Sequence, residues 1–319
     1  MKYKIFSLIF VFLSTLFILA GCTDGKTDAE NLVTATPTTL VGKQTIVLGD
    51  ISDDPAEVIE GTQPFADYIA EQLSDFGITE GQVKITSSAD EMAQLLASGE
   101  VDLYFDSVYP ATLVSDASGG EIILRRWRYG VEEYQSVIFT SVDSGITSID
   151  DLRGELIAFD NEFSTSGFVL PAVYLRKQGL QLDGKVSYND SVGEDKLGFV
   201  FSYDDENTLQ WVLRGFVAAG ATDDYNFDKA FPDDITANLV ELVRTESVPR
   251  QVVVISPQMD SEMLDLLIQI LITAHETKKG QIALEPFQTT KFDRFPEGIE
   301  VASNHMRDMV EIINGIPLP

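Results

Sequence analysis

Three consecutive hydroxyl side chains, Ser164, Thr165 and Ser166, are the residues of this chain best placed for ligand chemistry. They are followed by Gly167 and by a predicted helix that runs to Lys177. Hydroxyls and backbone N–H groups at a helix N-terminus form a socket for an oxyanion, because the donors converge and the helix dipole favours negative charge. One hydroxyl is enough to cap a helix, so capping alone is the alternative interpretation.

Further polar and aromatic side chains follow predicted strands, at the strand ends where the loops of an open α/β sheet bind ligands. These candidates are Asp106, Ser107 and Tyr109 after strand 101–105, Tyr203 and Asp204 after strand 199–202, Asp223 after strand 217–221, and Tyr134, Trp127 and Tyr129 near a crossing between the two halves of the chain. Any of the acids could instead be solvated, and the acidic run 204–206 also suits the first turn of a helix.

The sequence offers little that is typical of a catalytic or metal-binding site. The HExxH, GxSxG, Walker and CxxC patterns are absent, and the two histidines, His275 and His305, fall on predicted C-terminal helices away from the loops above. We therefore expect no catalytic residues, no metal and no cofactor. An enzyme that uses a pair of carboxylates stays the second functional class, and it would have to turn over an ester or a glycoside.

The charge of the chain narrows the range of partners. Among 319 residues, 51 are Asp or Glu and 22 are Lys or Arg, which gives a formal net charge of −29. This balance argues against a nucleic-acid binder, because such a protein needs a basic surface. High acidity favours a soluble monomer, and the length suggests two domains or two lobes.

The N-terminus is typical of an export signal. Lys2 and Lys4 precede an apolar stretch that ends in Leu-Ala-Gly-Cys at Cys22, the only cysteine of the chain. This ending resembles the lipobox of bacterial lipoproteins. It predicts a signal peptide over 1–21, a lipid anchor at Cys22, a flexible tether over 22–44, and an extracytoplasmic location at the bacterial cell envelope without a membrane-spanning helix. A plain secretory signal is the alternative.

Behind the tether, strand and helix patterns alternate as βαβαβ and then restart after residue 155, which predicts parallel sheets covered on both faces. Segment 91–107 resembles 207–223, and the strand 135–143 resembles 251–260. These echoes predict an α/β protein of two lobes, with lobe 1 over 45–135 and 255–319 and lobe 2 over 136–254. Two C-terminal amphipathic helices would complete lobe 1.

One family resemblance covers nearly all of the domain in order. Segments 134–154, 157–160 and 164–168, together with 63–69, 98–102 and 216–224, are similar to the phosphonate/phosphate-type solute-binding proteins of bacterial ABC transporters. The resemblance implies a type 2 periplasmic-binding-protein fold that delivers a solute to a membrane permease. It also implies that Ser164, Thr165 and Ser166 hold phosphoryl oxygens and that the loop 106–109 contributes.

Two departures from the family pattern bear on the ligand. The loop 106–109 lacks the usual Gly-Pro type of sequence, and a Ser-His-Asp turn of the family is replaced by Ser-Tyr-Asp at 202–204. Without that histidine a bare dianion is disfavoured. We therefore expect a solute with an oxyanion at the hydroxyls and a cationic end facing Asp204 or Asp223, such as an aminophosphonate. A cation caged by aromatic rings, another solute without phosphorus, and a ligand sensor remain alternatives.

Overall fold

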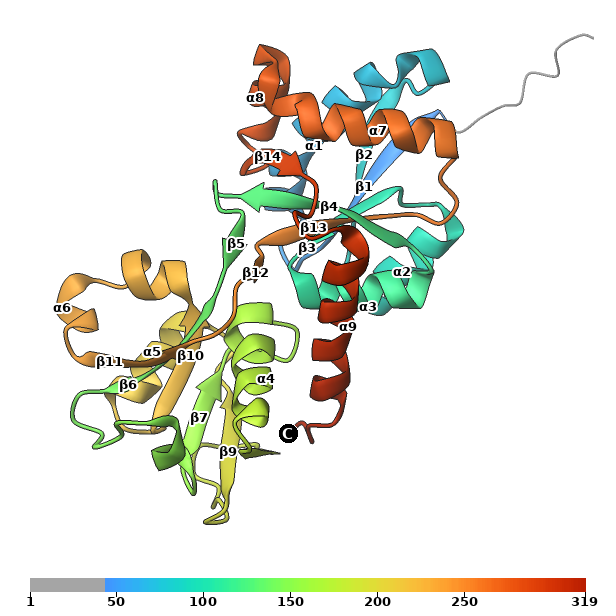
Figure 1. Cartoon of the computed structure of the whole chain (residues 1–319). Helices are drawn as coiled ribbons and strands as arrows, with labels where there is room; N and C mark the ends of the chain where they lie inside the picture. The colour runs from blue at the N-terminus through green and yellow to red at the C-terminus, as the bar shows by residue number, and fades with distance from the viewer. Residues whose placement is uncertain (1–43) are drawn as a thin grey trace, which may run out of the picture. The chain divides into compact units, whose positions relative to one another are not determined.

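The computed structural model describes residues 44–319 (Figure 1). The predicted signal peptide, Cys22 and all of the tether except Gln44 lie outside the described residues. The described chain forms two six-stranded sheets with helices on both faces, joined by a two-stranded sheet. The predicted α/β architecture with two lobes is therefore confirmed. No helix in residues 44–319 is long and apolar enough to cross a membrane.

The sheet of lobe 1 is mixed. Its strand order is β14 (Thr289–Asp293), β4 (Glu121–Arg128), β13 (Gln251–Ile255), β3 (Leu103–Asp106), β1 (Thr45–Ile51) and β2 (Glu80–Thr86). Strand β1 pairs in parallel with β2 and β3, as the βαβαβ pattern predicts, whereas β13 is antiparallel to β3 and β4. The carboxyl ends of β1 and β3 therefore lie at the same edge, where ligands bind in open sheets.

Helices cover both faces of this sheet because its strands alternate apolar side chains between two cores. Ile46 and Leu48 of β1 face one core and Val47 faces the other. The first core is closed by α1 (Pro55–Gln72), α7 (Ser261–Thr273) and α8 (Lys278–Leu284), and the second by α2 (Ala89–Ser98), α3 (Val108–Ser118) and α9 (Ile299–Asn314).

The sheet of lobe 2 repeats this plan. Its order is β11 (Leu239–Arg244), β6 (Ser136–Ser141), β10 (Ala219–Asp223), β7 (Leu156–Phe159), β9 (Lys196–Phe201) and β8 (Gln181–Gly184). It is flanked by α4 (Leu170–Lys177) on one face and α5 (Asp205–Leu213) on the other, and α6 (Asp233–Thr236) precedes β11. The segments β7, β9 and β10 are parallel, so the second βαβαβ unit is also confirmed.

The sequence similarity between segments 135–143 and 251–260 corresponds to two strands in equivalent positions, β6 in lobe 2 and β13 in lobe 1. Strand β6 lies antiparallel to β10 in lobe 2, and β13 lies antiparallel to β3 in lobe 1. The chain crosses between the lobes twice, through β5 (Glu133–Tyr134) and β12 (Val248–Pro249), which pair with each other. Figure 1 shows these two segments side by side between the sheets.

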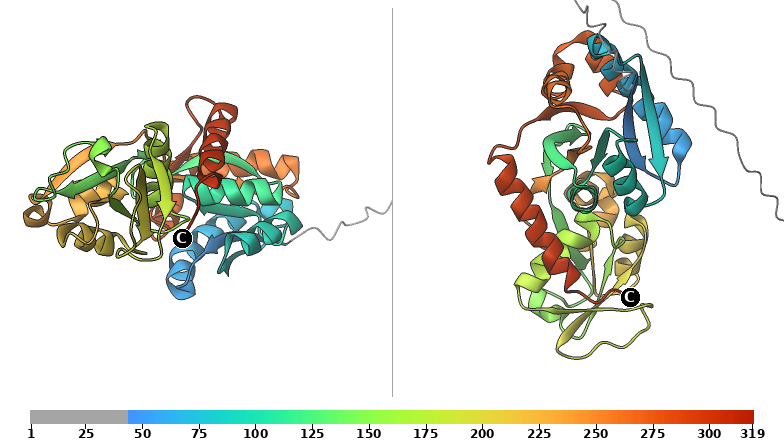
Figure 2. Two further views of the ribbon diagram at one scale, coloured as in Figure 1. Left: turned by 90° about the horizontal axis from the view of Figure 1, so that it is seen from below. Right: turned by 90° about the vertical axis from the view of Figure 1, so that its right-hand side faces the viewer.

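Two details of the predicted lobe boundaries need correction. Lobe 2 was expected to run to residue 254, but β13 pairs with β3 and β4, so the return crossing comes at β12. The sequence places the last helix in lobe 1, and α9 does pack on α3 of lobe 1, but it also packs on α4 of lobe 2. Figure 2 shows α9 running along both lobes, and the Gly184 backbone N–H of β8 donates to the Pro317 carbonyl just after it.

Candidate functional site

The two lobes meet where the first turn of α3 faces the turn between β7 and α4. The Thr165 hydroxyl donates to Ser107 Oγ at 3.1 Å and accepts from the Tyr109 backbone N–H at 3.0 Å. Thr165 is buried in this contact. Three residues predicted from separate parts of the chain therefore lie together.

The turn at residues 164–167 has its shape because of one cap and one glycine. Ser164 Oγ accepts from the Gly167 N–H at 3.0 Å, so this hydroxyl caps the helix, as the alternative interpretation allowed. A Cβ on Gly167 would lie 2.5 Å from Cβ of Asp160, so only glycine fits there. Ser164 also hydrogen-bonds the Asp160 carboxylate, which leaves Thr165 and Ser166 to face lobe 1 and the crossing strands.

Tyr134, on the crossing strand β5, contacts the turn at residues 164–167. Its hydroxyl hydrogen-bonds Thr165 and Ser166, and Arg250 lies 4.5 Å from its ring centroid. Burial raises the pKa of Tyr134, and the positive charge of Arg250 opposes this shift. The phenol stays protonated at neutral pH and can donate a hydrogen bond toward the hydroxyl turn.

Two pockets open on either side of this contact. The cleft pocket has a volume of about 330 Å³ and is lined by Ile51, Ser87, Ser88, Ala89, Asp106, Ser107, Pro110, Asp160, Asn161, Phe163 and Ser164. The tyrosine pocket has a volume of about 610 Å³ and is lined by Tyr129, Val131, Tyr134, Asp205, Asp223, Asp224, Tyr225, Asn226, Asp228, Lys229 and Arg250. The cleft pocket contains two carboxylates and no basic side chain among its described residues.

On the lobe 2 side the carboxylates perturb one another. Burial, and then the charges of Asp160, Asp223 and Asp204, raise the pKa of Asp205 to about 6, although the Thr222 hydroxyl donates to it at 2.8 Å. Burial first, and then Asp204 and Glu162, also raise the pKa of Asp160. Negative charge is therefore concentrated beside the hydroxyl turn.

The two residues predicted after β9 do not face these pockets. Asp204 is exposed, and its carboxylate accepts from the Asn207 N–H at 3.0 Å as the cap of α5. Tyr203 is 71% exposed and has a φ of 61°. The inward carboxylate of this run is Asp205, which sequence reasoning missed because three consecutive acids gave no sign of which one turns inward. The predicted residue Asp223 does line the tyrosine pocket, where it accepts from the Asn226 N–H at 2.8 Å.

The lobe 1 side holds two half-buried acids, Asp50 and Asp106. Asp106 accepts hydrogen bonds from the Tyr104 hydroxyl and from the Ser107 N–H, and its burial raises its pKa. Asp50, at the end of β1, was also missed from the sequence. Burial, and then the charge of Asp106, raise the pKa of Asp50 to about 6.

The family described as ABC transporter, phosphonate, periplasmic substrate-binding protein matches residues 51–296. The chain belongs to this phosphonate-binding family. The resemblance seen in the sequence is thereby confirmed. The family consists of non-catalytic binding components of transporters, so this phosphonate-family protein is an extracytoplasmic substrate-binding protein of a phosphonate-type ABC transporter, with a permease as its partner.

Solved structures agree with this assignment. XAC2383 from Xanthomonas citri bound to chloride is 27% identical, with a TM-score of 0.79, and the match covers 85% of this chain and 99% of that chain. The structure of XAC2383 bound to ATP is 26% identical, with a TM-score of 0.79, and the match covers 85% of this chain and 98% of that chain. PhnD1 from Prochlorococcus marinus, in complex with methylphosphonate, is 17% identical with a TM-score of 0.61 over 86% of this chain and 99% of that chain. The latter likeness concerns the fold alone.

Proposed function

We propose that this phosphonate-family protein captures a small organophosphonate that also carries a cationic group, such as an aminophosphonate, between its two lobes. The observation that carries the proposal is the set of carboxylates around the hydroxyl turn. Asp106 and Asp160 line the cleft pocket, and Asp205 and Asp223 line the tyrosine pocket. A bare dianion would be repelled by these groups, whereas a cationic end would offset them.

The oxyanion end of the solute would lie at the turn 164–166. Ser166 and Tyr134 offer hydroxyls there, and Thr165 can exchange its contact with Ser107 for a ligand oxygen. The chloride and ATP bound by XAC2383 support an anion-accepting role for this fold. The pairing of β5 with β12 supports a hinge at the two crossings, on which the lobes would close.

Calorimetry with three ligands tests this proposal. We expect 2-aminoethylphosphonate to bind at least about tenfold more tightly than methylphosphonate, because one charge-assisted hydrogen bond contributes that much. Ser166→Ala should weaken both ligands, and Asp106→Asn should weaken only the amine, while Asp265→Asn, an exposed acid of α7, should change neither. Tight binding of phosphate or methylphosphonate without binding of the amine would refute the proposal.

A cation held by aromatic rings is the second candidate. Tyr129, Tyr134 and Tyr225 line the tyrosine pocket beside Asp205 and Asp223, which favours this candidate. Trp127 and Tyr203, expected in such a cage, lie elsewhere, since Lys291 covers the Trp127 ring at 3.8 Å and Tyr203 is exposed. Binding of choline in place of any phosphonate, lost in Tyr225→Ala, would favour it.

A gene-deletion strain that still imports the solute would point to sensing rather than transport.

The lipid anchor is proposed from the sequence. Signal cleavage before Cys22 and acylation of its thiol would hold an acidic, monomeric binding domain at the membrane by a tether of about 22 residues. Metabolic labelling with a fatty acid, compared between the native chain and Cys22→Ser, tests it. Release of the native chain into the medium without label would show an ordinary secretory signal instead.

A further inference from the structure

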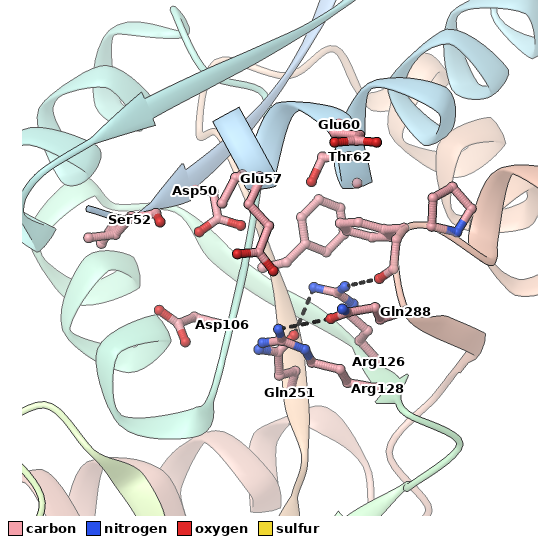
Figure 3. A pocket seen from close by; sticks show the side chains of 16 residues that line it. Asp50, Ser52, Glu57, Glu60, Thr62, Asp106, Arg126, Arg128, Gln251 and Gln288 are labelled. Atoms are coloured by element: carbon pink, nitrogen blue, oxygen red, sulfur yellow. Dashed lines mark hydrogen bonds between the residues drawn. The ribbon is translucent and has the colours of Figure 1, made fainter. Parts of the chain in front are cut away.

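A third pocket lies wholly within lobe 1 and shares two lining residues with the cleft pocket. It has a volume of about 540 Å³, and Ile51 and Asp106 line both pockets. Asp50 and Asp106 lie on one side, and the guanidinium groups of Arg126 and Arg128 lie across from them (Figure 3). We call it the lobe 1 pocket. Its lining carries both signs of charge, unlike that of the cleft pocket.

Arg126 is a fixed part of the wall. It is buried, and it donates to Thr289 Oγ1 at 2.7 Å, to Gln251 Oε1 at 2.8 Å and to the Phe287 carbonyl at 2.5 Å. Its guanidinium lies 3.6 Å from the centroid of the Phe287 ring. These contacts connect β4 to β13 and β14 and hold a positive charge in the wall of the pocket.

Arg128 differs from Arg126 because it has an unpaired hydrogen-bond donor within residues 44–319. It donates to Gln288 Oε1 at 3.1 Å and to the Tyr129 hydroxyl at 3.3 Å, while its buried Nε has no hydrogen-bond partner among the described residues. Neither Arg126 nor Arg128 forms an ion pair with a described carboxylate, although the chain has 51 acids. A guanidinium in this state can take a carboxylate in its forked geometry.

Asp50 is the complementary group. Within residues 44–319 its carboxylate has one hydrogen bond, from the N–H of the next residue Ile51 at the end of β1, and it faces Asp106. Asp205 of lobe 2 differs in this respect, because its carboxylate accepts hydrogen bonds from the side chains of Thr222 and Asn226. An ammonium group in the lobe 1 pocket would satisfy Asp50 and relieve its repulsion with Asp106.

From these contacts we propose that the lobe 1 pocket binds an α-amino acid end of the solute, with the ammonium at Asp50 and the carboxylate at Arg128. This inference rests on the proposed function and narrows it. The solute is then a phosphono amino acid, whose phosphonate lies at the turn 164–166 and whose chain passes Ile51 and Asp106, the two residues that line both pockets.

Two probes that differ by one carboxylate test this inference. In the native protein, 2-amino-3-phosphonopropionate should bind at least about tenfold more tightly than 2-aminoethylphosphonate, since the extra group makes a charge-assisted bond. Arg128→Gln should remove this difference without weakening 2-aminoethylphosphonate, because that probe has no carboxylate and its ammonium is repelled by the guanidinium, and Arg128→Lys should restore part of the difference. Asp50→Asn should weaken both probes, and Arg214→Gln, an exposed arginine of lobe 2, should weaken neither.

The outcomes separate this inference from the proposed function. Equal affinity for the two probes, or an equal loss of both in Arg128→Gln, would overturn the amino acid site while leaving the phosphonate proposal intact. Failure of the native protein to bind either probe would overturn both. Thermal unfolding of each variant without ligand shows whether it is folded, and Arg128→Lys keeps the test valid if the glutamine variant is not.

Discussion

The hydroxyl of Thr165 in lobe 2 lies 3.1 Å from the hydroxyl of Ser107 in lobe 1, and it also accepts the Tyr109 N–H. These two bonds connect the loops that the family pattern places around the ligand. The same donors would be shared with a phosphonate oxygen. In the proposed binding mode, Thr165 would therefore take part in both the contact between the lobes and the contact with the ligand.

We expect Thr165→Val to weaken phosphonate binding by about tenfold or more, because valine has a shape similar to that of threonine but lacks the buried hydroxyl. Thr165→Ser keeps the hydroxyl and should retain most of the affinity. Titration calorimetry of the three proteins with 2-aminoethylphosphonate is the measurement. Equal affinities of the native and valine proteins would mean that the hydroxyl does not contact the ligand.

The turn itself should not tolerate a methyl group at residue 167. Gly167→Ala would place a Cβ 2.5 Å from Asp160 Cβ and 2.8 Å from Ser164 Oγ, so the cap must move. We expect a loss of about 2 kcal/mol in the free energy of unfolding, within the range for overpacking. Gly145→Ala has open space around it and serves as a comparison for a loop glycine, although its positive φ adds strain. Urea denaturation measures both, and a smaller effect at residue 167 than at 145 would contradict the steric account.

The stability of the ligand-free protein should rise on acidification from pH 7.5 to pH 5. The pKa of Asp205 is about 6 in the folded protein, above its ordinary value of 3.8, so the folded state binds the proton more tightly than the unfolded state. This contribution is complete below pH 3.8 and is lost as the pH rises through 6. Asp205 alone should contribute ~1 kcal/mol over this interval.

Asp205→Asn should reduce that pH dependence, and Asp265→Asn should leave it unchanged. The carboxyls with lowered pKa values, Asp151, Asp183 and Asp228, affect stability only below their ordinary value, outside this interval. Melting temperatures at pH 5, 6 and 7.5 are the measurement. A native protein that melts at a lower temperature at pH 5 than at pH 7.5 would show that another group dominates.

Arg125 should be important for stability. Its buried guanidinium donates two bonds of 2.9 Å to the Asp293 carboxylate and one of 2.8 Å to Glu133, so it joins β4 to β14 and to the crossing strand β5. Arg125→Met would remove this partner from Glu133 and leave Asp293 only its longer 3.8 Å ion pair with Lys291, and it should cost about 3 kcal/mol. Arg153→Met, which breaks an exposed ion pair with Asp150, should cost less than about 1 kcal/mol. Similar losses in chemical denaturation would contradict this difference.

Local signals in the sequence predicted much of the fold. The Ser88 cap and the Gly99 end of α2 are as expected, because Ser88 accepts the Glu91 N–H and Gly99 has a φ of 75°. The echo between residues 135–143 and 251–260 predicted the two equivalent strands β6 and β13. Such features depend on neighbouring residues or on repeated patterns, which a single chain displays.

The charged residues of the site were harder to predict. Arg126 and Arg128 lie on β4, whose sequence Glu-Ile-Ile-Leu-Arg-Arg-Trp-Arg carries charge where a buried strand is normally apolar. Their placement depends on pairing with β13 and β14, more than 120 residues away. Asp50 and Asp205 were indistinguishable from other acids in a chain with 51 of them, because burial is set by the tertiary structure.

In the proposed binding mode, the cleft holds an organophosphonate by its cationic end as well as by its oxyanion. Competition calorimetry of the chain after Cys22, with methylphosphonate displaced by 2-aminoethylphosphonate, tests it most directly. We expect the amine to displace methylphosphonate with at least about tenfold higher affinity at pH 7.5 and to lose this advantage in Asp106→Asn. Equal or weaker binding of the amine in the native protein would contradict it.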